Sequence, residues 1–208
     1  MEKVIVPNQT EFKCYSQNIT ELDLSNCPDL TQLNCGNNKL KKLDLSKCSN
    51  LNILACCFSQ LTELDLSNCS NLTKLVCYTN RLTKLDLSHC PNLTILEFTG
   101  NQIIELDLSN CPNLTQLGCS LNQIQKLDVS NCPNLTYLCC YDNKLRELDL
   151  SKCPNLTKLY CRNNQITELD ISQNDKLVEL DFDYGVHQNI EQYRLWCKEN
   201  YTYDYVLK

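Results

Sequence analysis

The sequence is poor in the residues that many catalytic sites and disulfide-rich scaffolds need. It contains four glycines, six prolines and two histidines in 208 residues. So few glycines and prolines do not suit a loop-rich fold held together by disulfides. The two histidines, His89 and His187, lie far apart, and the sequence has no glycine-rich phosphate loop, nucleophile elbow or HExxH motif. We therefore predict a protein that is not an enzyme and that has no cofactor.

Long apolar runs and an excess of basic residues are also missing. No stretch approaches the roughly 18 consecutive apolar residues of a membrane-spanning helix. The 19 basic and 25 acidic residues give a formal net charge of −6, which argues against binding to nucleic acid or anionic membranes. The first residues, MEKVIVPNQT, do not form a secretory signal. We expect a cytoplasmic monomer from the chain as written, and a secreted or surface protein if a signal was trimmed or export is non-classical.

Cysteine, by contrast, is abundant, with 17 copies. Their odd number and the lack of an export signal indicate reduced thiols. Fourteen of them recur every 21 residues in two columns, and Phe98 takes the missing place in the second. The first column is Cys27, Cys48, Cys69, Cys90, Cys111, Cys132 and Cys153, and the second is Cys14, Cys35, Cys56, Cys77, Cys119, Cys140 and Cys161.

The whole sequence follows the same period. The pair Leu-Asp recurs at positions 22, 43, 64, 85, 106, 127, 148 and 169. Residues 10–177 thus form eight 21-residue units, a signature of a leucine-rich-repeat solenoid. In one unit Leu33 and Cys35 alternate with polar neighbours as in a half-buried strand, and no helical pattern of about 10–12 residues fits. We predict a right-handed, curved, parallel β coil that is nearly helix-free, with a short strand on each flank.

The repeat motif has a known relative. The pattern LxxLxCxxNxL, followed by a return segment with LDLS, resembles the bacterial internalin-type leucine-rich repeat over roughly residues 10–177. This resemblance implies a solenoid with a ligand-binding concave face, in a family of surface adhesins and invasion factors.

Both ends of such a solenoid need caps, because each coil buries its leucines only against its neighbours. We assign residues 1–9, with the strand-like Val4-Ile5-Val6, to an N-terminal cap. Residues 178–208 are predicted to form a degenerate repeat and a C-terminal α/β cap. In that cap, residues 189–200 have helical spacing and residues 201–205 alternate like a strand.

Several columns are predicted to be structural. A linear cysteine column cannot offer zinc four converging ligands, so we expect the thiols to pack in the core and to bind no metal. Asparagines after each strand are expected to bond the backbone of two coils. Aspartates of the LDLS segments should need hydrogen bonds from the next coil. The column Glu21, Lys42, Glu63, Lys84, Glu105, Lys126, Glu147 and Glu168 mostly alternates in sign, which predicts control of coil register.

Functional residues are expected where the repeats stop agreeing. The LDLS half hardly varies, whereas the outward residues of the LxxLxC strand change in every coil. Apolar and aromatic residues gather there in two clusters, separated by a small polar coil at 116–120, and such surface is typical of partner sites. Chance drift on a tolerant surface is the alternative. The predicted site residues are Ile53, Cys57, Phe58, Val76, Tyr78, Ile95, Tyr137, Cys139, Tyr141, Tyr160 and Arg162.

These patterns predict a non-enzymatic module that binds a protein partner on its concave strand face. One alternative is an internalin-like adhesin or a secreted effector that engages a host protein. A thiol-redox or metal-handling protein is the alternative from another class. Because strand side chains alternate faces, Cys57 and Cys139 should point away from their neighbours Cys56 and Cys140 and react readily with alkylating agents.

Overall fold

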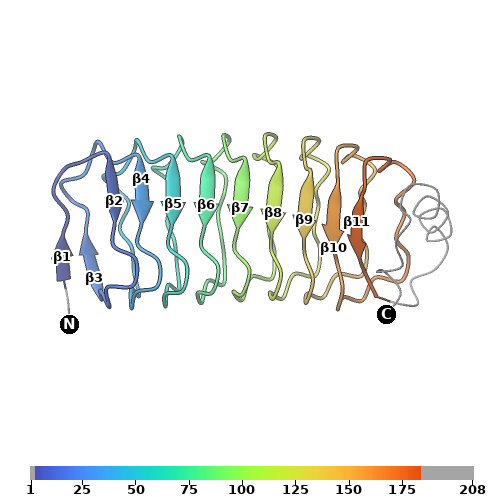
Figure 1. Cartoon of the computed structure of the whole chain (residues 1–208), viewed down its shortest axis with the longest axis horizontal. Helices are drawn as coiled ribbons and strands as arrows, with labels where there is room; N and C mark the ends of the chain where they lie inside the picture. Colours follow the sequence, from blue (N-terminus) through green and yellow to red (C-terminus); the bar gives the residue numbers. More distant parts are fainter. Residues whose placement is uncertain (1–2, 184–208) are drawn as a thin grey trace.

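The structure is a computed structural model and describes residues 3–183. In this part of the chain, eleven three-residue strands stand in a row along the long axis of the molecule (Figure 1). They are β1 (Lys3–Ile5), β2 (Glu11–Lys13), β3 (Glu21–Asp23), β4 (Gln32–Asn34), β5 (Ile53–Ala55), β6 (Lys74–Val76), β7 (Ile95–Glu97), β8 (Gln116–Gly118), β9 (Tyr137–Cys139), β10 (Lys158–Tyr160) and β11 (Glu179–Asp181).

Nine of these strands form one parallel sheet in the order β11-β10-β9-β8-β7-β6-β5-β4-β2. Each strand pairs with the residues 21 positions away, so that Leu33 lies beside Leu54 and Leu54 beside Leu75. The predicted parallel solenoid with a 21-residue repeat is therefore confirmed, as is the absence of helix over residues 3–183. Nothing in that range is a helix with the length and apolar character needed to cross a membrane.

The return half of each coil has fewer strand pairings than we expected. Within residues 3–183, pairing there is limited to β1 with β3 and an isolated bridge between Glu105 and Lys126. Backbone donors there are used partly in local turns, such as Cys48 N to Leu45 O (2.9 Å), and partly in single bonds to the preceding coil, such as Gln60 N to Leu40 O (2.9 Å). A chain that turns back on itself every few residues cannot also present an extended edge to the next coil, so the expected second strand is absent from most repeats.

The two ends differ in how far the structure describes them. At the N-terminus, β1 pairs in parallel with β3, and Val6 is buried against the first coil. At the other end, β11 adds a ninth strand to the large sheet, as the decayed ninth repeat predicts. The helix and strand that we predict for residues 189–205 lie outside the described residues.

Leucine and cysteine fill the interior, as predicted. Sixteen cysteines are buried as free thiols in the described part of the chain, and Phe98 is fully buried in its cysteine column. Burial raises the pKa of Cys48 to about 11 and that of Cys90 to about 12. These thiols are therefore protonated at neutral pH and act as small core side chains.

Thiols of the return half also donate hydrogen bonds to the preceding coil. The Sγ of Cys27 donates to Val6 O (3.4 Å), and that of Cys132 donates to Cys111 O (3.6 Å). An aliphatic side chain of similar size would leave these carbonyls without this bond. The preference for cysteine over valine in this column thus has a polar component that composition alone does not reveal.

The asparagine column joins consecutive coils, as predicted. The Nδ2 of Asn101 donates to Cys77 O (3.1 Å) in the preceding coil and to Phe98 O (2.8 Å) in its own. Its Oδ1 accepts from Leu82 N (3.0 Å), again in the preceding coil. The same pattern repeats at Asn38, Asn80, Asn122, Asn143 and Asn164. One amide therefore bonds three backbone groups in two coils.

Serine interrupts this column at one position. Ser59 stands where the period places an asparagine. Its Oγ is buried and has no hydrogen-bond partner in the structure. A hydroxyl is too short to span two coils as the amide does, so this coil lacks the bridge that its neighbours have.

The aspartate column works differently from our expectation. Asp44 Oδ1 accepts a hydrogen bond from Ser46 N (2.9 Å), two residues further along the same coil. Every Leu-Asp pair makes this Asx turn. The bonds from Ser46 hold the pKa of Asp44 below its usual value. The expected hydrogen bonds from the next coil are therefore replaced by bonds within each turn.

The alternating charge column makes fewer ion pairs than its sequence suggests. Lys42 pairs with Glu63 at 3.6 Å, and Lys3 on β1 pairs with Glu21 at 2.8 Å. The remaining members of the column form no ion pair with one another within residues 3–183. Both observed pairs are solvent-exposed, so register rests mainly on the backbone and the asparagines.

Candidate binding face

The outward side chains of the nine-stranded sheet and of the second residue after each strand form what we call the strand face. Its three columns run across the coils at 21-residue intervals. The first column runs from Glu11 through Ile53 and Ile95 to Glu179, the second from Lys13 through Val76 and Glu97 to Asp181, and the third from Tyr15 through Cys57 and Tyr78 to Asp183.

The N-terminal cluster of this face gathers around the Cys57 thiol. A Cβ at Gly36 would lie 3.1 Å from Cys57 Sγ and 3.2 Å from the Tyr15 ring, so glycine makes room for both. The ring of Phe58 meets that of Tyr78 edge-on, with centroids 5.0 Å apart. A hydrogen bond with Cys57, together with burial, raises the pKa of Tyr78 to about 12. The phenol is therefore neutral at physiological pH and already bonded to the Cys57 thiol.

The aliphatic part of this cluster is less continuous than we predicted. Ile53, Val76 and Ile95 are each half-buried on the strand face. In the register of the sheet, however, Lys74 lies between Ile53 and Ile95. The predicted apolar patch is thus crossed by one basic side chain, because the period puts residue 74 in the same column as the two isoleucines.

Three tyrosines and a second cysteine form the C-terminal cluster. The rings of Tyr137 and Tyr160 lie 5.7 Å apart at 52°. Burial, aided by Cys139, raises the pKa of Tyr137, and Tyr141 is also half-buried. The Oγ of Ser120, fully buried, donates to Cys139 Sγ at 3.2 Å. The predicted aromatic cluster therefore contains one direct ring contact, between Tyr137 and Tyr160.

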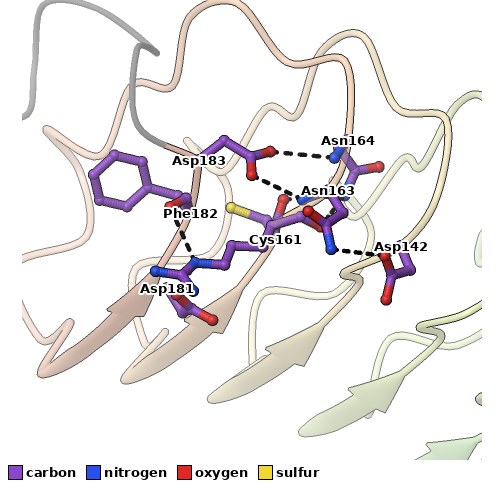
Figure 2. Close-up of polar contacts among 8 residues, drawn as sticks. Asp142, Cys161, Asn163, Asn164, Asp181, Phe182 and Asp183 are labelled. Atoms are coloured by element: carbon purple, nitrogen blue, oxygen red, sulfur yellow. Dashed lines mark hydrogen bonds and ion pairs between the residues drawn. The ribbon is translucent and has the colours of Figure 1, made fainter. Parts of the chain in front are cut away.

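Arg162 lies at the end of this cluster with its guanidinium already engaged. Its Nε pairs with Asp181 Oδ1 at 2.5 Å and donates to Phe182 O at 3.4 Å. Next to it, Asp183 accepts hydrogen bonds from the backbone N–H groups of Asn163 and Asn164 (Figure 2). Arg162 thus joins the last strands at the edge of the aromatic cluster. We predicted from the sequence that it contacts a partner, and the sequence did not reveal these contacts within the chain.

Cys57 and Cys139 do not have the accessibility that we expected. Both lie outside the main core cluster, yet their side chains are only 5% and 9% exposed. Cys57 is packed beside Gly36 and forms a hydrogen bond with Tyr78, and Cys139 accepts a hydrogen bond from Ser120 and forms one with Tyr137. The expected exposure of the two thiols is therefore wrong, although both side chains lie outside the main core cluster as predicted.

Phe58 and Leu121 stand in an unusual backbone conformation at the rim of the strand face. Their φ angles are 51° and 53°, and their side chains are 44% and 48% exposed. Other coils use Asn37, Asn163 or Gly100 at the equivalent place. A bulky side chain in this conformation costs about 1–2 kcal/mol. Comparison of this column between repeats would have identified Leu121, which sequence reasoning missed.

Sequence reasoning also missed an acidic residue between the two clusters. Glu97, at the end of β7, is half-buried, and burial raises its pKa. A Cβ at Gly118 on β8 would collide with its carboxylate, which therefore lies directly over that glycine. Gly118 takes a place in the second column of the strand face where most coils have a larger side chain, and this difference was the sequence signal that could have pointed to Glu97.

Comparisons with known proteins agree with this architecture. The family described as leucine-rich repeats in two copies matches residues 133–192, and a second leucine-rich-repeat family matches residues 89–105. The chain carries leucine-rich repeats. A comparison with curated proteins found no match.

Several solved structures share the fold. Internalin C2 from Listeria monocytogenes is 22% identical over 84% of this chain and 80% of its own, with a TM-score of 0.73. The functional domain of InlJ from the same species, which includes a cysteine ladder, is 34% identical over 81% of this chain and 47% of its own, with a TM-score of 0.48. The plant peptide hormone receptor RGFR1, solved in complex with RGF2, is 26% identical over 77% of this chain and 29% of its own, with a TM-score of 0.67.

The matches differ in length from this leucine-rich-repeat chain. This chain spans 47% of the InlJ domain, 61% of internalin InlF from Listeria monocytogenes and 52% of the leucine-rich-repeat protein LIC12759 from Leptospira interrogans. Internalin InlF and internalin C2, with TM-scores of 0.68 and 0.73, share the solenoid fold with this chain. Leucine-rich repeats commonly serve as protein-interaction modules, and this is the function class that the family supports.

Proposed function

We propose that this chain is a non-enzymatic protein-binding module whose partner contacts the strand face. The observation that carries the proposal is the contrast between the uniform LDLS half and the strand face, where aromatic side chains replace polar ones in two clusters. Tyrosine rings offer large contact areas with little conformational entropy to lose, and they are favoured at the centres of protein interfaces. RGFR1, the plant peptide hormone receptor that resembles this chain in fold, was solved in complex with RGF2, which supports a role in binding for this solenoid.

A partner-capture experiment with a matched control tests this proposal. The wild-type chain and the double variant Tyr78→Ala/Tyr137→Ala are immobilised and exposed to extracts of the source organism. Ile104→Ser serves as the control, since it removes exposed apolar surface away from the strand face, where the side chain is 45% exposed. We expect a protein retained by the wild type and by Ile104→Ser to be lost from the double variant. Retention that is unchanged in the double variant would refute the assignment of the strand face.

The internalin-type motif suggests a narrower form of the proposal, in which the partner is a host protein bound by an adhesin or a secreted effector. The same three proteins, exposed to surface proteins of animal cells, test this form. Specific retention from that source, with the same dependence on the strand-face tyrosines, is the expected result. Retention only from the organism's own extract would exclude the adhesin form while leaving the general proposal in place.

A further inference from the structure

The carboxylate of Glu97 stands between the two aromatic clusters of the strand face. Its neighbours in the sheet are Val76 on one side and Gly118 on the other, and neither offers a polar side chain. Its charge nevertheless acts on both clusters, since it contributes to the raised pKa of Tyr78 and of Tyr137. The acid is thus central to the surface that we propose as the binding face.

This carboxylate has no counter-ion within residues 3–183. The charge of Lys74 opposes the rise in the pKa of Glu97 that burial causes, yet the two residues form no ion pair. Other acids of the strand face are paired, as Glu179 is with Lys158 at 2.8 Å. A half-buried charge without a partner is unfavourable, so a cation that reaches it gains more than it would at an exposed acid.

Glycine at residue 118 gives the carboxylate its place. A side chain there would collide with the Glu97 carboxylate and push it away from the sheet. The φ angle of Gly118 does not lie in the left-handed region, so the backbone itself does not require glycine. The residue is therefore explained by the space that the acid occupies.

We infer that Glu97 receives an arginine or lysine side chain of the protein partner, flanked on the partner by apolar residues that contact the tyrosine clusters. This inference rests on the proposed function of the strand face. A single carboxylate suits a basic side chain better than a metal ion, and no cluster of metal-ligating residues occurs in the described part of the chain. Tyrosine rings beside the acid add favourable contacts to a guanidinium or ammonium group. The net charge of −6 favours approach of a basic partner.

Selection from a phage library of random twelve-residue peptides tests the inference without knowledge of the natural partner. We expect peptides whose binding depends on Tyr78 and Tyr137 to contain a basic residue. When this basic residue of the peptide is replaced by glutamine, the affinity of the peptide for the wild-type protein should fall about tenfold. Its affinity for the Glu97→Gln variant should change little. Gly118→Ala, which displaces the carboxylate but keeps its charge, should weaken binding as Glu97→Gln does. Glu179→Gln, which removes a paired acid from the same face, should not.

The possible results separate this inference from the proposed function. Peptides that need the two tyrosines but bind Glu97→Gln and Gly118→Ala as tightly as wild type would overturn the inference and leave the binding face intact. A selection that yields no peptide dependent on the tyrosines would count against both. Thermal unfolding of Glu97→Gln and Gly118→Ala, expected to match that of wild type closely, shows that lost binding does not reflect lost fold.

Discussion

The strand half and the return half of each coil are held to their neighbours by different groups. Along the strand half, backbone atoms make the contacts, as in Cys35 N to Ala55 O (2.9 Å). Along the return half, thiols such as Cys27, which donates to Val6 O, and single backbone bonds such as Gln60 N to Leu40 O (2.9 Å) join the coils, while each aspartate closes an Asx turn within its own coil. A side chain that holds the turn cannot be exchanged freely, whereas one that merely projects from a backbone ladder can. This difference explains why sequence variation gathers on the strand face.

The asparagine turn lies between the two halves, and substitutions there should lower the free energy of unfolding more than substitutions in either half. Asn101→Ala leaves one buried N–H and two buried carbonyls without the amide. We expect a loss of about 3 kcal/mol in the free energy of unfolding, measured with urea. Asn113→Ala removes an exposed bond to Pro91 O (3.2 Å) and should cost less than about 0.5 kcal/mol. Equal losses for the two variants would show that the bridging role is wrong.

The serine gap in the same column offers the converse experiment. In Ser59→Asn, the new Oδ1 should reach Leu40 N–H, as Asn80 Oδ1 reaches Leu61 N–H at 3.1 Å. The buried hydroxyl that has no partner would also disappear. We expect a gain of about 1 kcal/mol in the urea-derived free energy of unfolding. Asn80→Ser should produce a loss of at least similar size, and a Ser59→Asn protein less stable than wild type would contradict this account.

The sequence predicts some parts of the molecule better than others, and the difference lies between repeated residues and residues that occur once. Residues repeated in every coil, such as the leucines and the two cysteine columns, predict the core and the strand register because each copy repeats the same evidence. Contacts between residues that occur once are different. The burial of Cys57 depends on Gly36 and Tyr15 in earlier coils, and the placement of Glu97 depends on Gly118 in the next. Such contacts join single residues across coils, and no periodic average contains them.

The Asx turns should make the return half sensitive to acid. Bonds from Ser109 hold the pKa of Asp107 below its unfolded value of about 3.9. The resulting stabilisation is present above that pH and is lost as the pH falls through the lower, folded-state pKa. Asp107→Asn keeps the oxygen that accepts from Ser109 N but has no charge to titrate. We expect wild type to be the more stable at pH 7 and the difference to close as the pH falls from about 5 to about 2.

Urea unfolding of both proteins across this pH range provides the measurement. Asp107→Ala, which loses the hydrogen bond as well, should be less stable than Asp107→Asn at every pH. A difference between wild type and Asp107→Asn that does not change with pH would mean that the Asp107 charge plays no part in the turn.

Substitutions in the charge column should change the free energy of unfolding least. They also distinguish an ion pair that forms from charges that are only near one another. Lys84→Glu places three acids in succession with Glu63 and Glu105, yet Lys84 forms no ion pair with either in the described structure. We therefore expect a loss of no more than about 0.5 kcal/mol. Lys42→Glu breaks the 3.6 Å pair with Glu63 and should cost more, up to about 1 kcal/mol.

Salt provides the test of mechanism for this pair of variants. Both losses should shrink in about 1 M salt, where the Debye length falls to about 3 Å and exposed charges are screened. A loss for Lys84→Glu that persists in high salt would show that the lysine stem stabilises the coil by packing. A loss larger than that of Lys42→Glu would mean that alternation along the whole column, rather than contact within one pair, controls how the return halves align.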